Sequence, residues 1–441
     1  MNPRHLRKQQ CENLNYRKKY AQFATALFRG VKSGKQFGMK FVIAPTLAEE
    51  IADKAILRKT AVQFKPTRAE GLAVLATFTQ YAGKAYQERR NFDTDASQVS
   101  AVSQLSPWLR HRLISEQEVL TSACNQHSLE AAISFVQQVF WRGYFKGWLE
   151  QHPTVWQSYT SQLAKAQQNL SHDYADAIAG QTGILCFDHW CQALKNDGYL
   201  HNHARLWFAS IWIFTLKIPW VLGAAFFLEH LHDGDPASNT LSWRWVAGLH
   251  TKGKNYVATA DNIEKFTDGR FRPTGQLAQA PAPLVENEEH LFVPFEPAQN
   301  ELNRLHLLVI TEEDCLSGFK VDPRSSGVLG LVSPDASHFA KTAVQNTVSE
   351  LGGNTYVGHH WSKAITLAAQ NARTSKILTP YIPVGHVADG MGVAANTLKG
   401  HGIDLTMSTR PYDLQIWPNA TKGFFKLKKK IPSILEALKI G

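Results

Sequence analysis

One apolar run limits the folds open to this chain more than any other feature. Residues 208–228, FASIWIFTLKIPWVLGAAFFL, are long enough to cross a bilayer as a helix. Lys217 and Pro219 lie near the centre of the run, where a lysine is costly in lipid and a proline breaks a helix. We therefore expect two buried core helices with a break at the proline, and no membrane span.

The hydrophobic pattern divides the chain into four parts. Residues 1–85 are a basic, helical lead segment, and residues 86–271 show successive helical patterns with short connections. Residues 272–301 are rich in proline and acidic residues, which is typical of a linker. In residues 302–441 short apolar runs alternate with helical patterns, which predicts a smaller, Rossmann-like α/β domain with a parallel sheet. Its strands are expected at 305–310, 327–332, 376–382 and 403–408, and its helices at 336–351, 361–373 and 387–399.

Composition narrows the possible partners and compartment. Twelve Trp suit an aromatic-lined pocket or a large helical core. The net charge of +10 favours polyanionic partners such as nucleic acid or an anionic membrane surface. Five cysteines without a CxxC spacing predict free thiols in a reducing compartment. The opening residues, MNPRHLRKQQ, hold no apolar stretch, so we expect no signal peptide.

Residues 232–248, HDGDPASNTLSWRWVAG, place two acids, an amide and two indoles in one short loop and the helix after it. Asp-Gly and Asp-Pro are ordinary turn chemistry, so a surface turn that leads into a helix is one interpretation. A calcium loop is excluded, because Ala237 stands at the fifth-position ligand and Arg244 at the closing Glu. A binding site is the other interpretation.

The helical pattern at 134–148 brings polar groups to one face. Gln138, Trp141 and Arg142 are spaced i, i+3 and i+4, so they share a face that can hydrogen-bond, stack on and neutralise a flat anionic ligand. The alternative is a helix at the edge of the core, with an arginine that reaches solvent.

Two further segments offer polar groups. In residues 198–210, Asn202 and Arg205 share an otherwise apolar helical face. A buried Arg needs a partner, and Asp233 is the candidate. His201 and His203 lack a third ligand nearby, so no metal site is predicted.

Residues 100–115 predict a capped helix start, with Ser106 as the cap and Pro107 as the first helical residue. The hydroxyls of Ser103 and Ser106, together with free amides at this helix start, would make a phosphate seat. A capped helix that binds nothing is the alternative.

Taken in order, these segments resemble the FAD-binding helical domain of the DNA photolyase and cryptochrome family. Tyr86, the Ser-x-x-Ser-Pro stretch, the Trp-Arg helix, GQTGILCFD, HNHARLWFAS and DGDPASN with its Trp-x-Trp follow one another over about residues 86–270. The resemblance implies a FAD held deep among helices. By motif position, its contacts would come from Tyr86, Ser103, Ser106, Arg142, Asn202, Arg205, Asp233, Asp235 and Asn239.

The resemblance also implies roles for four tryptophans. Trp243 matches the electron donor next to the flavin, and Trp220 matches the middle relay of the family. Trp141 and Trp245 match the indoles that clasp a flipped pyrimidine dimer, with Gln138 on the base edges. Arg142 and its basic surroundings would grip the lesion strand, and Asn239 would sit beside the flavin ring, where photolyases keep an Asn.

Several positions depart from the family pattern. Enzymes that repair cyclobutane dimers usually carry Glu at the place of Gln138, and Gln is typical of enzymes for six-four photoproducts. The two His expected for six-four repair are replaced by Asn202 and Leu206. The surface Trp of the relay has no counterpart, and Tyr174 is its possible substitute. The α/β segment follows the helical one, whereas typical members place an antenna-binding domain first.

The resemblance implies a blue-light-driven lyase that splits pyrimidine dimers in DNA by electron transfer from reduced FAD. A cryptochrome-like photoreceptor with a signalling partner, and a flavin-free scaffold, are the alternatives. We expect a monomer in the cytoplasm, or at the nucleoid or in the nucleus if it repairs DNA. An antenna-like C-terminal domain would hold a pterin, a second flavin or nothing. The run KLKKK at 426–430 is either a solvated basic face or a contact for DNA phosphates.

Overall fold

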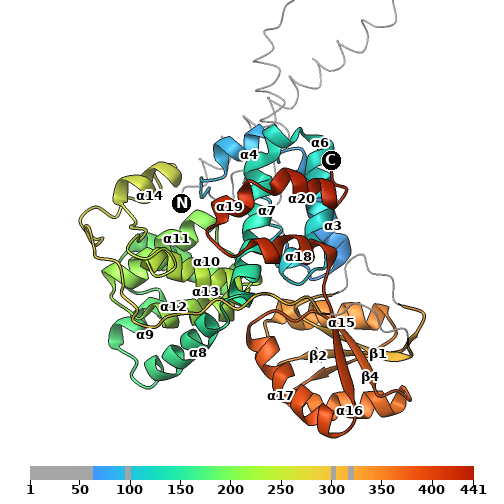
Figure 1. Cartoon of the computed structure of the whole chain (residues 1–441). Helices are drawn as coiled ribbons and strands as arrows, with labels where there is room; N and C mark the ends of the chain where they lie inside the picture. Colours follow the sequence, from blue (N-terminus) through green and yellow to red (C-terminus); the bar gives the residue numbers. More distant parts are fainter. Residues whose placement is uncertain (1–62, 95–100, 299–303, 316–321) are drawn as a thin grey trace, which may run out of the picture. The chain divides into compact units, whose positions relative to one another are not determined.

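A computed structural model of the chain describes residues 63–94, 101–298, 304–315 and 322–441 (Figure 1). All of these residues belong to one compact unit. Most of the predicted lead segment, up to residue 62, lies outside the described residues, as does Cys11.

The first part of the described chain is helical, as predicted. Several helices begin at side-chain caps: Ser115 and Glu118 form a reciprocal capping box, and the hydroxyls of Thr67 and Ser128 accept backbone N–H groups of the first turn. The helices are α3 (Arg68–Thr79), α4 (Lys84–Arg89), α5 (Ser106–Arg110), α6 (Glu116–Gln126), α7 (Leu129–Glu150), α8 (Thr154–Ala166), α9 (His172–Ala179), α10 (Leu185–Asp197), α11 (Asn202–Ser210), α12 (Trp220–His230), α13 (Pro236–Ala247) and α14 (Ala260–Phe266).

The apolar run at 208–228 forms buried helical segments with a break, as predicted. Helix α11 continues into the π-helix η2 (Ile211–Thr215), and α12 begins only after Pro219. Lys217 stands in the break with a φ of 54°, a left-handed conformation that ends the preceding helix. Among the described residues, no helix is both long enough and apolar enough to span a membrane.

The described portion of the predicted linker, residues 272–298, contains neither helix nor strand. It is nevertheless fastened along the helical part. Glu286 accepts two hydrogen bonds from the guanidinium of Arg244 on α13, one of them 2.8 Å long. Further along, the Val293 N–H donates to the Gln151 carbonyl over 2.8 Å. These bonds set the path of the chain from α14 to the sheet.

The C-terminal part contains the predicted parallel α/β fold. Five parallel strands pair in the order β3-β2-β1-β4-β5, a doubly wound arrangement. Four of them match the predicted strands, and β3 was not predicted. The elements are β1 (His306–Thr311), β2 (Ser325–Val332), α15 (His338–Glu350), β3 (Asn354–Val357), α16 (Trp361–Asn371), β4 (Lys376–Pro380), α17 (His386–Gly400) and β5 (Asp404–Ser408).

The two faces of the sheet contribute to different cores. Along β1, Leu308 and Ile310 pack with the core of helices α3 to α7, while Leu307 and Val309 pack with α16 and α17. Alternate residues of a strand point to opposite faces, so one strand serves both cores. The sheet is therefore part of the core that holds the helical part together.

After β5 the chain returns to the helical part. The last elements are α18 (Pro411–Ile416), η3 (Trp417–Asn419), α19 (Phe424–Lys428) and α20 (Ile431–Ala437), and α18, η3 and α19 contact α7 (Figure 1). Glycines make this close packing possible, because a Cβ at Gly147 would lie only 2.6 Å from the Trp417 Cα. Within the segment predicted as one α/β domain, the last thirty residues thus share a core with α3 to α7.

The described cysteines carry free thiols, as predicted. Burial raises the pKa of the Cys186 thiol to about 12 and that of Cys191 to about 11. Both thiols therefore stay protonated and unreactive at neutral pH.

Candidate functional site

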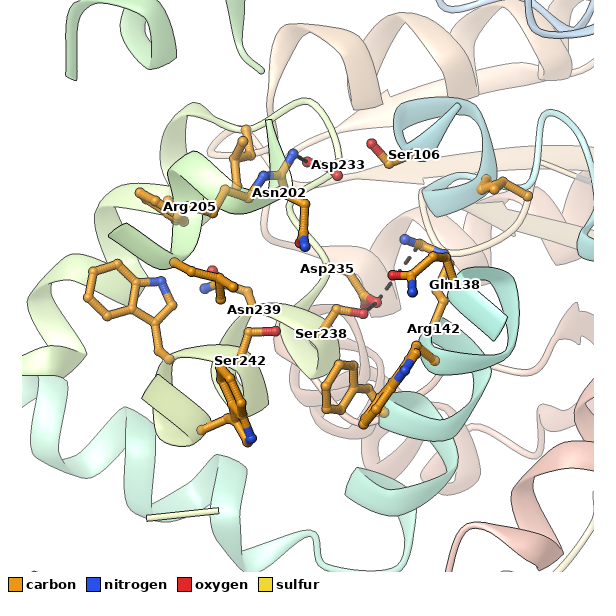
Figure 2. Close-up of a pocket in the computed structure, with 18 of the residues that line it drawn as sticks. Ser106, Gln138, Arg142, Asn202, Arg205, Asp233, Asp235, Ser238, Asn239 and Ser242 are labelled. Atoms are coloured by element: carbon orange, nitrogen blue, oxygen red, sulfur yellow. Dashed lines mark hydrogen bonds and ion pairs between the residues drawn. The ribbon is translucent and has the colours of Figure 1, made fainter. Parts of the chain in front are cut away.

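A cavity of about 410 Å³ opens between α5, α7, α11 and α13. Figure 2 shows Arg205, Asn202 and Asn239 on one side of it, Gln138 and Arg142 on the other, and Asp235 with Ser238 between them. The predicted cofactor and lesion residues all line this one cavity, namely Tyr86, Ser103, Ser106, Gln138, Trp141, Arg142, Asn202, Arg205, Asp233, Asp235, Asn239, Trp243 and Trp245. Trp220, the predicted middle relay, is not among the residues that line it.

Asp233 and Arg205 form the predicted ion pair, with Arg205 Nη2 3.1 Å from Asp233 Oδ1. Burial raises the pKa of Asp233, but the charge of Arg205, helped by the nearby Ser106 hydroxyl and by Arg142, outweighs burial and holds that pKa below its usual value. The carboxylate therefore stays ionised, and a fixed negative charge faces the cavity.

Ser106 reaches this pair in a way that the sequence did not predict. The expected helix cap at Ser106 is wrong: α5 begins at Ser106, its N-cap is Leu105, and no side-chain cap bond is present. The Ser106 hydroxyl instead lies near Asp233 and helps to lower the pKa of that carboxyl.

Asp235 holds a second buried negative charge. Its carboxylate accepts a 2.7 Å hydrogen bond from Ser238 and lies 3.8 Å from Arg142 and 3.5 Å from Lys146. Although burial alone would raise the pKa of Asp235, Lys146, Arg142 and Arg110 hold it far below its usual value. Asp235 thus pairs with both cationic side chains of α7, of which Arg142 lines the cavity.

A residue that follows the first strand of the α/β part supports this arrangement. Lys146 lies 3.1 Å from Glu313, which follows β1, and Arg110 of α5 lies 2.6 Å from the same carboxylate. Arg110 also donates to the Gly234 carbonyl, between the two acids of the loop, over 3.0 Å. Sequence reasoning missed Lys146, Arg110 and Glu313.

The end of β1 carries further buried charges. Glu312 accepts from His386 over 3.1 Å, and Asp314 pairs with Arg112 and Arg410. Doubly wound sheets usually take ligands at the carboxyl ends of their central strands. Here the acids that follow β1 pair with Arg110 of α5 and with Arg112 just after it. This end of the sheet therefore joins the α/β part to the helical part.

The two predicted clasp indoles differ in their surroundings. Trp141 stacks on Phe424 of α19, with ring centroids 3.8 Å apart and planes inclined by 15°. Trp245 stacks more loosely on Tyr256 at 5.8 Å and is 37% exposed. One face of Trp141 is thus covered by Phe424 of α19, while Trp245 is the more exposed of the two indoles that line the cavity.

Trp243 lies in the wall of the cavity and is buried. Its ring packs edge-on against Trp212 with centroids 6.1 Å apart, and Trp212 packs edge-on against Tyr174 at 6.0 Å. Trp220 instead packs against Tyr159 at 5.6 Å. Sequence reasoning named Tyr174 as a possible relay residue and missed Trp212.

The polar groups of the cavity fit a large ligand with an anionic part and a flat ring system. Arg142 Nε and Trp243 Nε1 are buried and have no hydrogen-bond partner among the described residues. Unpaired buried donors are costly unless a ligand satisfies them. Arg142 suits a phosphate oxygen, and Asn239, whose amide N–H donates to the Ala224 carbonyl over 2.8 Å, suits a ring edge.

Comparison with known proteins agrees with this geometry. Residues 135–279 match the family described as the FAD binding domain of DNA photolyase. The deoxyribodipyrimidine photo-lyase of Streptomyces griseus is 34% identical over 194 residues, which cover 41% of this chain and 42% of that protein. The deoxyribodipyrimidine photo-lyase of Alkalihalophilus pseudofirmus is 24% identical over 268 residues, 58% of this chain and 54% of that one.

Among solved structures, a bacterial class III photolyase from Agrobacterium tumefaciens is 25% identical with a TM-score of 0.39. The match covers 51% of this chain and 45% of that chain. The chain spans about half the length of the curated relatives it matches. Residues 135–279 of the helical part are therefore a flavin-binding domain. It is of the DNA photolyase type, and its cofactor is FAD.

Proposed function

We propose that this protein is a light-driven enzyme that splits pyrimidine dimers in DNA. The observation that carries the proposal is the shared cavity: Trp141 and Trp245 line the same space as the Arg205–Asp233 pair and Asn239. A cofactor and two flipped bases would therefore meet inside one pocket. The curated relatives are named deoxyribodipyrimidine photo-lyases, which supports this reaction.

The residues divide the work within the cavity. When bound, reduced FAD supplies an electron that light makes energetic enough to enter a dimer. The Arg205–Asp233 pair orients the ring side of the pocket, because a planar donor and a fixed carboxylate define direction as well as charge. Arg142, held by Asp235, neutralises the diphosphate, and Asn239 presents its amide to the ring edge.

The lesion side of the cavity is aromatic. Trp141 and Trp245 stack on the two bases that leave the duplex and replace the stacking that those bases lose. Gln138 lies one helical turn before Trp141 on the same face and lines the cavity, where its amide hydrogen-bonds the base edges. An amide both donates and accepts, so this position tolerates cyclobutane and six-four lesions alike in hydrogen-bonding terms.

A binding experiment tests the clasp separately from the cofactor. Trp141→Ala is expected to weaken binding to a dimer-containing oligonucleotide by about tenfold, because one stacked base is worth about 1–3 kcal/mol. Flavin absorption should remain. Trp148→Ala, on the same helix but outside the cavity lining, serves as the control. Equal lesion affinity of the Trp141 variant and the wild type would remove the clasp assignment.

A blue-light photoreceptor without repair activity is the second candidate. The stacking of Phe424 on Trp141 favours it, because a ring face covered by the protein is not free for a base. Illumination separates the two candidates: in a photoreceptor the flavin absorption changes while a dimer-containing oligonucleotide survives. Loss of the dimer excludes the photoreceptor-only function.

A further inference from the structure

Helix α19 joins a buried anchor to an exposed, cationic surface. Phe424 and Leu427, one turn apart, are buried against the core, while the intervening Phe425 is 73% exposed. Exposed lysines accompany this ring at positions 422, 426, 428, 429 and 430. Among the large apolar side chains that the structure describes as exposed, Phe425 is the most exposed aromatic one, ahead of Phe292 at 47% and Trp245 at 37%.

The anchor places this surface beside the cavity. Phe424 stacks on Trp141 at 3.8 Å and packs edge-on against Tyr144 at 5.7 Å, and Trp141 lines the cavity. Phe425 is the next residue along the chain after Phe424, so it follows directly the residue that packs on a ring of the cavity wall. Figure 1 shows α19 close to α7, the helix that carries Trp141.

The charge of this surface is uncompensated. Among the described residues, Lys422, Lys426, Lys428 and Lys429 form no ion pair with an acid, and Lys430 donates to the Asn419 side-chain oxygen over 2.7 Å. Free ammonium groups around an exposed ring match the chemistry of nucleic acid, which offers phosphates for the cations and bases for the ring.

We propose that α19 and the residues up to Lys430, here called the C-terminal rim, form a DNA contact beside the cavity. The lysines bind phosphates next to the lesion, and Phe425 enters the gap that two flipped bases leave in the duplex. Apolar side chains act as such wedges because a ring restores part of the lost stacking. The partner is therefore a DNA duplex with a helix-distorting lesion. The wedge role rests on the proposed function, whereas the phosphate contacts require only that the protein binds DNA.

Binding of the full chain to fluorescent duplexes in the dark tests the proposal. The probes are one duplex with a cyclobutane dimer and the same duplex undamaged, each titrated over a range of salt concentrations. K426Q/K428Q should weaken binding to both duplexes and lower the slope of log affinity against log salt by about 2, because each lost phosphate contact removes about 1. Phe425→Ala should weaken binding to the damaged duplex by about tenfold and leave the undamaged duplex unchanged.

Matched substitutions elsewhere on the surface serve as controls. K363Q/K399Q removes the same charge from exposed positions on α16 and α17, and Leu185→Ala shortens an apolar side chain that is 76% exposed on α10. The proposal is overturned if K426Q/K428Q keeps the wild-type salt slope or changes it no more than K363Q/K399Q does. Equal losses for Phe425→Ala and Leu185→Ala would remove the wedge.

The outcomes also separate this inference from the proposed function. If the wild type repairs dimers and Phe425→Ala binds the damaged duplex as tightly as the wild type does, the proposed function stands and the wedge role is wrong. A protein that binds DNA through the rim lysines but never repairs a dimer loses the proposed function and keeps the phosphate contacts. Retained flavin absorption in every variant shows that the fold around the cavity is intact.

Discussion

The ammonium group of Lys146 lies 3.1 Å from the carboxylate of Glu313, and both groups are buried. Lys146 belongs to helix α7, whereas Glu313 follows the first strand of the sheet. The same ammonium lies 3.5 Å from Asp235, a wall residue of the cavity. The α/β part therefore takes part in setting the charge of the flavin pocket, although none of its described residues lines that pocket.

Removal of this shared cation should cost stability. Lys146→Gln leaves Asp235 and Glu313 facing each other with less compensation, and breaking a buried pair typically costs about 3–5 kcal/mol. Urea unfolding should therefore shift strongly, and the purified variant should retain less FAD. Lys84→Gln, which breaks the exposed pair with Glu88, is the control and should change stability by about 0.5 kcal/mol or less. Similar losses in the two variants would refute the coupling.

The electron path is expected to run through the rings that contact Trp243. Electron transfer between aromatic rings falls steeply with their separation, and Trp212 packs against Trp243 and Tyr174. Trp243→Phe and Trp212→Phe should each slow photoreduction of the bound flavin, measured by absorption under blue light. Trp220→Phe should slow it less. A strong effect of Trp220→Phe with a normal Trp212→Phe would support the relay that the family resemblance implies.

Glu150 should make stability depend on pH. Burial raises the pKa of Glu150 to about 7. Hydrogen bonds from the Val384 N–H and the Tyr381 hydroxyl lower this pKa, but burial is the larger effect. Because the folded protein holds this proton more tightly than the unfolded chain does, the stabilisation is complete below about pH 4.5 and is lost as pH rises to 7. A rise of this size in the pKa corresponds to about 3 kcal/mol.

The variant Glu150→Gln isolates this effect, since an amide keeps the shape of the protonated acid without titrating. Unfolding free energies of the variant and the wild type should be similar at pH 4.5 and should diverge up to pH 7.5, with the variant more stable. A difference between the two proteins that stays constant over this range would show that Glu150 does not titrate there.

Gly147 should be required for the docking of the C-terminal helices. A Cβ at this position would lie 2.6 Å from the backbone Cα of Trp417, so Gly147→Ala is expected to destabilise the protein by about 1–3 kcal/mol. Gly392 lies inside α17, where an added Cβ would meet no atom within 4 Å, so Gly392→Ala should stabilise by about 0.5–1 kcal/mol. Thermal unfolding of both variants measures this difference in stability. If Gly147→Ala is as stable as Gly392→Ala, the C-terminal helices can shift to make room for the added Cβ, and Gly147 is not required.

The sequence predicts the members of the cavity well, because each one belongs to a local pattern. Gln138, Trp141 and Arg142 share a helical face through their spacing alone, and Asp233 and Asp235 stand in one turn. The alternation of short apolar runs and helical patterns likewise predicts the parallel sheet. Strand β3 escaped prediction because it has only four residues, none of them fully buried, and so lacks an apolar signal.

The contacts that cross the chain could not be predicted in this way. Glu313 is 167 residues from Lys146 in the sequence. Phe424 lies near the C-terminal end of the described chain, and yet it stacks on Trp141 of α7. No periodicity relates residues so far apart, because their meeting depends on how the sheet and the last helices dock on α7. The helix cap predicted at Ser106 is wrong because α5 begins one residue earlier than the pattern indicates, with Leu105 as its N-cap.

The central claim is that light absorbed by this protein repairs a dimer held in its cavity. The direct measurement is the amount of intact cyclobutane dimer in an oligonucleotide before and after blue light, with wild-type protein and with Trp141→Ala, and with a six-four lesion as a parallel substrate. The account predicts that wild-type protein removes one of these lesions under light and not in the dark, and that Trp141→Ala removes far less. Survival of both lesions, while the flavin absorption of the same sample changes under light, would contradict it.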